Sequence, residues 1–316
     1  MPSAIFLDSG GVINDNAQRA PQWVQYLGEF LPTTILGGSA RVWGQANTQI
    51  MGSFFSRWHE YMAQAIELAT KAQAKALVEG QDPNLVRSGE DKTLNVYWIF
   101  ERLQLVIWIQ EMCRVAAPHV PGLESDILPK LTDEDFFQLG RSAHLYAITR
   151  VKADYPGAVD TIRLLSASRA TRPDQAFKLC TSSGDSYEDL EYILKGLEVW
   201  ECFDEIYGSD RVNCLKTSPQ YYERVFARVG VCPVLRDDSG AAVEGQEGRD
   251  EVVVVDDSMK ALKWARMLGA RTVLIAEQEV DLSQEENSHI DYHLKALSEL
   301  PGLLESWQAH LTGGQV

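Results

Sequence analysis

The chain has 316 residues, 45% of them apolar and 23% charged, with a formal net charge of −16. Its length allows one large globular domain or two smaller ones, and its acidity disfavours nucleic acid as a partner, because both are negatively charged. No apolar stretch reaches the roughly 20 residues of a membrane span, and the first residues lack the pattern of a signal peptide, so we expect a cytoplasmic protein with no membrane partner.

The cysteines and histidines form no metal-binding pattern. The five cysteines are scattered and contain no CxxC pair, and the six histidines are equally dispersed. Such a set is typical of reduced thiols and predicts neither a disulfide framework nor a zinc site.

The first predicted element is a buried strand, AIFL at residues 4–7, which ends at Asp8. Ser9, Gly10 and Gly11 follow, where a strand cannot comfortably continue. From Pro21 to about residue 145, apolar residues recur at helical spacing. The predicted helices of this part cover residues 22–31, 53–77, 94–116 and 133–148, with glycine- and proline-rich breaks between them.

After residue 150 the pattern alternates between helix and strand. Predicted strands cover residues 177–181, 203–208, 251–255, 271–276 and 289–294, and predicted helices cover 158–168, 186–197, 218–230, 258–270 and 298–307. This alternation predicts an α/β fold with a doubly wound, Rossmann-like parallel sheet. We therefore expect one α/β domain made of residues 1–16 and 150–316, interrupted by an all-helical domain at 17–149. The polar, glycine-rich segment 234–250 is predicted to be a long loop.

Polar side chains follow three of the predicted strands. Asp8 ends the first, Thr181, Ser182 and Ser183 end the second, and Asp256 and Asp257 follow the strand 251–255. Lys216 precedes a helix. In an open parallel sheet the ligand site lies beyond the carboxyl ends of the strands.

Together these groups suit phosphoryl chemistry. Paired acids can hold Mg²⁺, a hydroxyl and a lysine can bind an anion, and an aspartate can attack phosphorus. Taken singly, each residue also has an ordinary structural explanation, as a turn former, a helix cap or a solvated lysine.

The order of these segments resembles that of the haloacid dehalogenase (HAD) superfamily. IFLDSGGVIND is similar to the first motif, FKLCTSS to the second, LKTSPQYY to the third and VVVVDDSMKALKWARMLGARTVLI to the fourth. The helical insertion follows the first motif directly, as in family members with a C1-type cap. At roughly 130 residues it is longer than a simple cap of that class.

The resemblance assigns roles to individual residues. It makes Asp8 the nucleophile and a Mg²⁺ ligand, with the backbone carbonyl of Gly10 as a further ligand and Gly11 in the phosphate-binding turn. The remaining roles fall to five residues: Thr181 as the phosphate-binding hydroxyl with Ser182 beside it, Lys216 as the cation that steadies Asp8 and the phosphoryl oxygens, and Asp257 as the principal acidic metal ligand with Asp256 beside it.

Gly10 departs from the family pattern, in which most phosphatases carry a second aspartate that acts as general acid and base. Its loss removes proton delivery to the leaving oxygen, typically worth about 10² to 10⁴ in rate. The expected function is a Mg²⁺-dependent phosphatase of a small phosphorylated molecule, with Asp15, His59 or His144 as substitute acids. Two alternatives stay open: a metal-independent haloacid dehalogenase, and a weakly catalytic binding or regulatory protein.

The helical insertion is rich in aromatic residues, among them Trp23, Trp43, Trp58, Trp98 and Trp108. Most are expected to pack between helices, while a minority would favour a substrate with an apolar or aromatic part. Arg41, Arg57 and Arg141 are candidate contacts for an anionic substrate group, although single arginines are usually surface charges.

Overall fold

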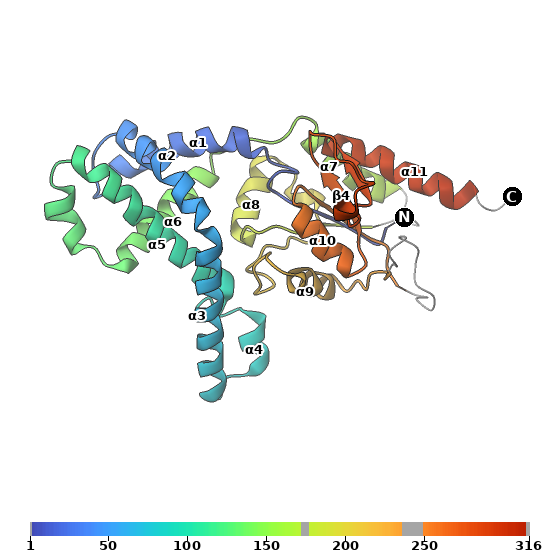
Figure 1. Cartoon of the computed structure of the whole chain (residues 1–316), viewed down its shortest axis with the longest axis horizontal. Helices are drawn as coiled ribbons and strands as arrows, with labels where there is room; N and C mark the ends of the chain where they lie inside the picture. The colour runs from blue at the N-terminus through green and yellow to red at the C-terminus, as the bar shows by residue number, and fades with distance from the viewer. Residues whose placement is uncertain (1, 172–176, 236–248, 314–316) are drawn as a thin grey trace. The chain divides into compact units, whose positions relative to one another are not determined.

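The computed structural model describes residues 2–171, 177–235 and 249–313. The chain divides into two compact units, Met1–Asn16 with Ala153–Val316, and Ala17–Lys152. Most of the predicted loop 234–250 lies outside the described residues. Figure 1 shows the strands in the first unit and helices alone in the second.

The first unit is built on a five-stranded parallel sheet with the order β2-β1-β3-β4-β5. Its strands are β1 (Ala4–Leu7), β2 (Lys178–Thr181), β3 (Val252–Asp256), β4 (Arg271–Ile275) and β5 (Tyr292–Leu294). Its helices are α7 (Ala158–Thr171), α8 (Tyr187–Gly196), α9 (Pro219–Val229), α10 (Met259–Met267) and α11 (Leu300–Gly313). Short helical turns cover Trp200–Cys202, Glu285–Asn287 and Leu297–Glu299.

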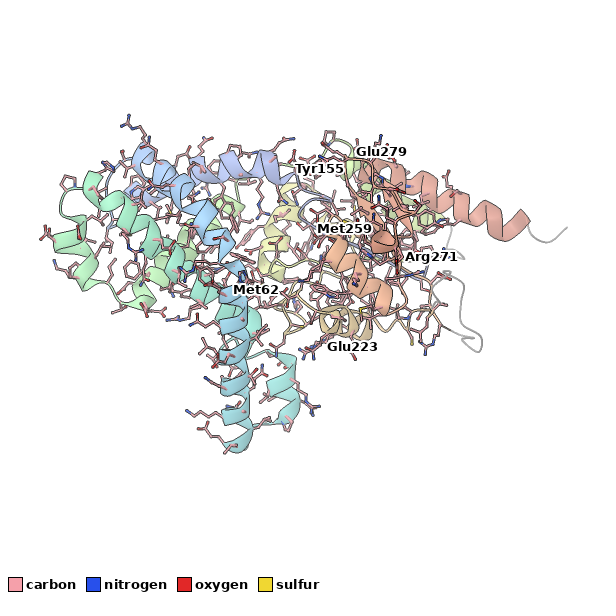
Figure 2. The ribbon with its side chains drawn as sticks, viewed as in Figure 1. Met62, Tyr155, Glu223, Met259, Arg271 and Glu279 are labelled. Atoms are coloured by element: carbon pink, nitrogen blue, oxygen red, sulfur yellow. The ribbon has the colours of Figure 1, made fainter. Side chains whose placement is uncertain are left out.

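Apolar side chains pack on both faces of this sheet. Val252 and Val254 share one cluster with residues of α9 and α10, while Val253 and Val255 share the opposite cluster with residues of α7, α8 and α11. Because successive side chains of a strand point to opposite faces, the run of four valines is buried on both sides. The predicted doubly wound α/β fold is therefore confirmed. Arg271, the first residue of β4, is labelled in Figure 2. Its guanidinium forms a 3.0 Å ion pair with Glu251.

The strand register aligns the polar residues at the carboxyl edge. Leu7 is the Cα partner of both Thr181 and Val255. The next row across the sheet therefore holds Asp8, Ser182 and Asp256. These three continue the alternation that sends Phe6, Cys180 and Val254 to the face covered by α9 and α10.

The predicted strand 203–208 is wrong. The segment lies along β2, where Thr181 N donates to Glu205 O and Ser183 N donates to Tyr207 O, but it forms only an isolated bridge between Cys180 and Glu205. The Asp204 carboxylate, rather than a backbone carbonyl, accepts the hydrogen bond from Leu179 N at 2.7 Å. A side chain therefore interrupts the backbone ladder, although the pattern of the segment favours a strand.

The second unit consists of helices joined by loops and turns, with no strand among its described residues. It contains α2 (Ala40–Ser56), α3 (Trp58–Val78), α4 (Pro83–Ser88), α5 (Val96–Ala116) and α6 (Asp133–Ile148), together with most of α1 (Asn16–Phe30). Short turns cover Leu31–Thr33, Ala117–His119, Leu123–Ile127 and Leu128–Lys130. The predicted helix 53–77 is in fact parts of two helices, because the chain leaves helical geometry at Arg57. The segment 40–52 is a helix that we did not predict.

Aromatic residues of the insertion pack mainly against one another. Phe54 lies 5.4 to 5.9 Å, centroid to centroid, from Phe55, Trp58 and Tyr61, and Trp58 packs edge-on against Phe100 at 5.0 Å. Trp43, which is fully buried, donates from its indole nitrogen to Gly37 O at 2.7 Å. In the described part of the chain, no helix is long and apolar enough to cross a membrane.

Candidate active site

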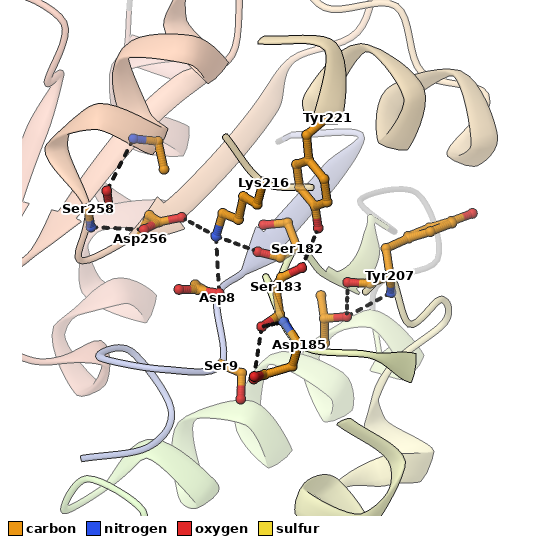
Figure 3. A network of polar contacts seen from close by, with 12 residues as sticks. Asp8, Ser9, Ser182, Ser183, Asp185, Tyr207, Lys216, Tyr221, Asp256 and Ser258 are labelled. Carbon is orange, nitrogen blue, oxygen red and sulfur yellow. Dashed lines mark hydrogen bonds and ion pairs between the residues drawn. The ribbon is translucent and has the colours of Figure 1, made fainter. Parts of the chain in front are cut away.

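Asp8 and Lys216 form the centre of the polar row. Lys216 Nζ lies 3.1 Å from Asp8 Oδ1 and 2.7 Å from Asp256 Oδ2, and it donates to Ser182 O at 2.7 Å (Figure 3). Its side chain is 9% exposed and that of Asp8 is 12% exposed. The lysine therefore connects the ends of β1, β2 and β3 through one ammonium group.

Both carboxylate oxygens of Asp256 accept hydrogen bonds from neighbouring residues. Its Oδ2 accepts from Lys216 and, at 3.1 Å, from the hydroxyl of Tyr222 on α9, while its Oδ1 accepts from Ser258 N at 2.9 Å. The residue is completely buried. Burial raises the pKa of Tyr222 well above its usual value, so this phenol stays a hydrogen-bond donor. Asp256 thus fixes the position of Lys216.

Asp257 lies beside the turn that follows β1. A carboxylate oxygen from each of Asp8, Asp256 and Asp257 lies within 4.8 Å of the others. Gly11 has φ +79°, and a Cβ placed on it would lie 1.9 Å from Asp257 Oδ2. Glycine is therefore required at position 11, both for its backbone conformation and for the close approach of this carboxylate.

The cluster carries more negative than positive charge. Burial raises the pKa of Asp8 to about 8; the ammonium of Lys216 opposes this shift, and the carboxylates of Asp256 and Asp257 add to it. Partial desolvation, with the Asp256 carboxylate next in weight, raises the pKa of Asp257 to about 6. Burial alone would lower the pKa of Lys216, but the carboxylates of Asp256 and Asp8 outweigh it and raise that pKa. The lysine stays charged.

The donor set fits a divalent cation such as Mg²⁺. Three carboxylates around one ammonium leave two uncompensated charges when all are ionised. Beyond the ion pair with Lys216, the buried Asp8 Oδ1 accepts no hydrogen bond from the described residues. Mg²⁺ prefers such oxygen ligands and binds through one or two carboxylates, substrate phosphate and water. Asp8 and Asp257 are better placed as ligands than Asp256, whose oxygens already accept three hydrogen bonds.

The prediction that the Thr181 hydroxyl binds phosphate does not fit this geometry. Thr181 is fully buried, and its Oγ1 both donates to Tyr207 O at 3.2 Å and accepts from Tyr207 N at 2.8 Å. As a partner of Leu7 it belongs to the row before Asp8, so its side chain leaves the opposite face of the sheet. The hydroxyl is thus committed to the extended segment beside β2.

Ser182 occupies the row of Asp8. Its backbone N donates to Leu7 O at 2.9 Å, and its carbonyl accepts from Lys216. Its hydroxyl is buried beside the Tyr222 phenol, but it makes no hydrogen bond to a described residue that meets the usual distance and angle limits. Ser182 is therefore the better candidate for an anion-binding hydroxyl.

Gly10 differs from its neighbour Gly11. It is not among the glycines with positive φ, and a Cβ placed on it would meet only the carboxamide of Asn16, at an ordinary contact distance of 3.5 Å. Neither backbone conformation nor packing therefore requires glycine at position 10.

Of the substitute acids proposed from the sequence, Asp15 belongs to the first unit, whereas His59 and His144 belong to the helical unit. Asp15 is held through its backbone N, which donates to Ala153 O at 2.6 Å. His59 is exposed on α3, and the His144 ring lies edge-on to Trp23 at 5.1 Å, both within the helical unit. Of the candidate arginines, Arg141 pairs with the buried Glu101 at 2.6 Å, Arg57 pairs with Glu60 at 3.1 Å and Arg41 is exposed on α2.

Two tyrosines were not foreseen as site residues. Tyr221 and Tyr222 are both fully buried at the start of α9; the hydroxyl of Tyr221 donates to Ser183 O at 2.9 Å and that of Tyr222 donates to Asp256. Buried phenols need a hydrogen-bond partner. Two adjacent tyrosines in the first turn of the helix that follows Lys216 are the signal that could have found them.

A parallel α/β sheet with an aspartate at the end of its first strand, a lysine before a late helix and an acid pair after β3 defines the class of HAD-like hydrolases. The chain belongs to the haloacid dehalogenase-like hydrolase family, whose model matches residues 2–269. No curated protein matches it.

Several solved structures share the fold. A defluorinating L-2-haloacid dehalogenase is 16% identical, with 96% of this chain and 95% of the other covered and a TM-score of 0.52. A protein assigned as a β-phosphoglucomutase, from Thermotoga maritima, is 16% identical over 96% and 99% of the two chains, also with 0.52. A 2-haloacid dehalogenase from Pseudomonas syringae pv. Tomato DC3000 is 14% identical over 97% and 100%, with 0.50.

Proposed function

We propose that the protein is a cytoplasmic, Mg²⁺-dependent phosphatase that hydrolyses a small phosphorylated molecule through an aspartyl-phosphate on Asp8. The observation that carries this proposal is the surplus negative charge of the Asp8, Asp256 and Asp257 cluster, which a single lysine does not neutralise. A site that only displaced halide with Asp8 would gain nothing from a third carboxylate beside the nucleophile.

In the first step, a carboxylate oxygen of Asp8 forms a bond to phosphorus while the bond from phosphorus to the ester oxygen breaks. The leaving oxygen takes that electron pair and departs. Lys216 stabilises the negative charge around the reacting carboxylate, and Ser182, in the row of Asp8, contributes its hydroxyl to the phosphoryl oxygens.

In the second step, water attacks the phosphorus of the aspartyl-phosphate. The bond between phosphorus and the Asp8 oxygen breaks, which releases inorganic phosphate, returns the carboxylate and leaves the proton of the water to bulk solvent or phosphate. Asp256 accepts from Lys216 and Tyr222 throughout and keeps the ammonium in place.

Mg²⁺ would be held by Asp8, Asp257 and the backbone carbonyl of Gly10, with Asp256 beside them, and would neutralise charge on the phosphoryl oxygens. The turn at Gly11 lets the Asp257 carboxylate approach closely enough to bind the same ion as Asp8. In this proposal the helical unit has the part of a cap that selects the substrate, including any apolar or aromatic group on it.

Gly10 sets the preferred leaving group. With no acid at this position, an alkoxide would have to depart unprotonated, whereas a phenolate or a carboxylate departs readily. Aryl and acyl phosphates are therefore the substrate class that this site suits best.

The test is release of phosphate from p-nitrophenyl phosphate with and without Mg²⁺. We expect activity that EDTA abolishes and Mg²⁺ restores, and that Asp8→Asn reduces to background. Asn84→Ala, at an exposed helical position in the other unit, is the matched control and should retain full activity. Activity that persists in Asp8→Asn would overturn the proposal.

The ion pair between Lys216 and Asp8 supports a second candidate, a metal-independent dehalogenase. The 3.1 Å contact places a cation beside the nucleophile and favours its ionised form without any metal, and displacement of halide needs no leaving-group proton. Halide release from 2-chloropropionate that is insensitive to EDTA would favour it. Absence of both activities, with tight retention of a phosphate ester, would instead indicate a binding protein.

A further inference from the structure

The position that Gly10 leaves without a side chain is bordered by one polar group. A Cβ on Gly10 would lie 3.5 Å from both Nδ2 and Oδ1 of Asn16 and 4.0 Å from its Cγ. A longer side chain at position 10 would therefore begin in contact with this carboxamide. The Asn16 carboxamide therefore borders the space in which the acid of other family members would stand.

Asn16 is available to a ligand, whereas Asn14 is not. Asn14 is 5% exposed, and its Nδ2 donates to Ser9 Oγ at 3.1 Å, which stabilises the turn after β1. Asn16 is exposed, and its carboxamide makes no hydrogen bond to a described residue. Of these two asparagines in the same short segment, the one with a free carboxamide is the one beside Gly10.

The backbone around Asn16 is well anchored. Gly11 N donates to Asn14 O at 2.8 Å, Ile13 N donates to Ser9 O at 3.1 Å and Asp15 N donates to Ala153 O at 2.6 Å. These bonds tie the segment to the end of β1 and to the chain that re-enters the first unit. The Asn16 backbone is therefore fixed relative to Asp8, and only its short side chain needs to orient.

From this juxtaposition we infer that Asn16 is a specificity-determining residue that hydrogen-bonds the leaving oxygen of the substrate, an inference that rests on the proposed phosphatase function. A carboxamide donates a hydrogen bond through Nδ2 but has no proton to transfer. It stabilises an oxygen that leaves as an anion, while the proton that this oxygen finally takes comes from water. The site is thereby matched to phosphate esters of phenols and to acyl phosphates.

The inference is tested with Asn16→Ala on a series of para-substituted phenyl phosphates whose leaving groups differ in pKa. The donor matters more as more charge develops on the leaving oxygen. We expect kcat/KM to fall about tenfold for phenyl phosphate and less for p-nitrophenyl phosphate, so that rate depends more steeply on leaving-group pKa. Asn84→Ala is the matched control and should leave the slope unchanged. An equal loss for every ester, or no loss, overturns the inference.

A binding measurement separates this inference from the proposed function. The side-chain amide signal of Asn16, assigned by its disappearance in Asn16→Ala, is followed by NMR in ¹⁵N-labelled protein during titration with Mg²⁺ and either phenyl phosphate or phenylphosphonate. Asp8→Asn protein prevents turnover. The two probes share the ring and the phosphoryl group, but only the ester has a bridging oxygen. A shift with the ester alone supports the contact.

The outcomes are distinct. Equal shifts with both probes, or none, overturn the role of Asn16 whether or not the enzyme releases phosphate. Absence of Asp8-dependent phosphate release overturns the proposed function, and the NMR comparison, made then on the unmodified protein, still decides the contact.

Discussion

Gly10→Asp should convert the site into one that also hydrolyses alkyl phosphates. The backbone at position 10 accepts a side chain without strain, because its φ is not positive and the new Cβ would contact only Asn16, at 3.5 Å. We therefore expect a change of less than about 1 kcal/mol in the free energy of unfolding, as for an ordinary surface substitution.

The gain in rate follows from the chemistry of the leaving group. A general acid in this position is worth about 10² to 10⁴ for a leaving group that needs a proton. Asn16 competes with the new side chain for the same space, so we expect the low end of that range, about 10²-fold in kcat/KM for glycerol 1-phosphate. For p-nitrophenyl phosphate we expect less than about threefold, because p-nitrophenolate needs no proton to leave. The double variant Gly10→Asp with Asn16→Ala should show a larger increase in kcat/KM for the alkyl ester than Gly10→Asp alone.

The assay compares kcat/KM for the two esters between pH 5 and 9 in Mg²⁺, where the activity of Gly10→Asp toward the alkyl ester should fall above the pKa of the new acid. Gly302→Asp is the matched control, since position 302 is exposed and a Cβ there meets nothing within 4 Å. A folded Gly10→Asp variant in which the ratio of alkyl to aryl activity is unchanged would refute the reasoning.

Three further changes test the geometry of the cluster. Gly11→Ala should lower the free energy of unfolding by about 1 to 3 kcal/mol and abolish the thermal stabilisation by Mg²⁺, because the new Cβ would lie 1.9 Å from Asp257 Oδ2 at φ +79°. The control Gly52→Ala, in open space on α2, should be neutral or stabilising in the same thermal melts. Equal behaviour of the two variants would contradict the packing argument. Tyr222→Phe removes one of the hydrogen-bond donors to the buried Asp256 carboxylate. Urea unfolding should therefore show a free energy of unfolding lower by about 1 to 3 kcal/mol, and kcat/KM should fall at neutral pH. A variant with unchanged stability and kcat/KM would show that this hydrogen bond contributes nothing. In EDTA the free energy of unfolding should decrease as pH rises from about 4 to about 8. The pKa values of Asp8 and Asp257 are about 8 and about 6 in the folded protein and about 4 in the unfolded chain, so the folded state binds more protons over this range. Mg²⁺ should remove this trend, and a flat profile in EDTA would be inconsistent with the surplus negative charge.

The sequence predicted the edge of the sheet at which the polar groups meet, because apolar runs such as Val252–Val255 show where buried strands end. Register cannot be seen in the sequence. Thr181 and Ser182 both carry a hydroxyl, but successive side chains of a strand point to opposite faces of the sheet. Only the pairing of Leu7 with Thr181 shows that Ser182 is the one in the row of Asp8. A one-residue ambiguity at a strand end therefore led the prediction to Thr181, the hydroxyl that lies on the opposite face from Asp8.

Other features depend on contacts between distant segments. The strand predicted at 203–208 fails because the carboxylate of Asp204 takes the hydrogen bond of a backbone partner, which no local pattern encodes. The role of Tyr222 depends on α9 packing over the end of β3. The proximity of Asn16 to Gly10 depends on a tight turn whose hydrogen bonds close within the segment 9–14 and then continue to Ala153.

The two adjacent glycines of the first motif, Gly10 and Gly11, are present for different reasons. At Gly11 the left-handed backbone and the carboxylate of Asp257 exclude every other residue, so this glycine is a requirement of the fold. At Gly10 the backbone and the surrounding space would accept a side chain, and a glycine there even increases the entropy of the unfolded chain. Under the proposed phosphatase function, the glycine that the fold does not require is explained by the chemistry of the site. Absence of an acid would keep a protonated carboxyl away from the leaving oxygen and would restrict turnover to esters that do not need it.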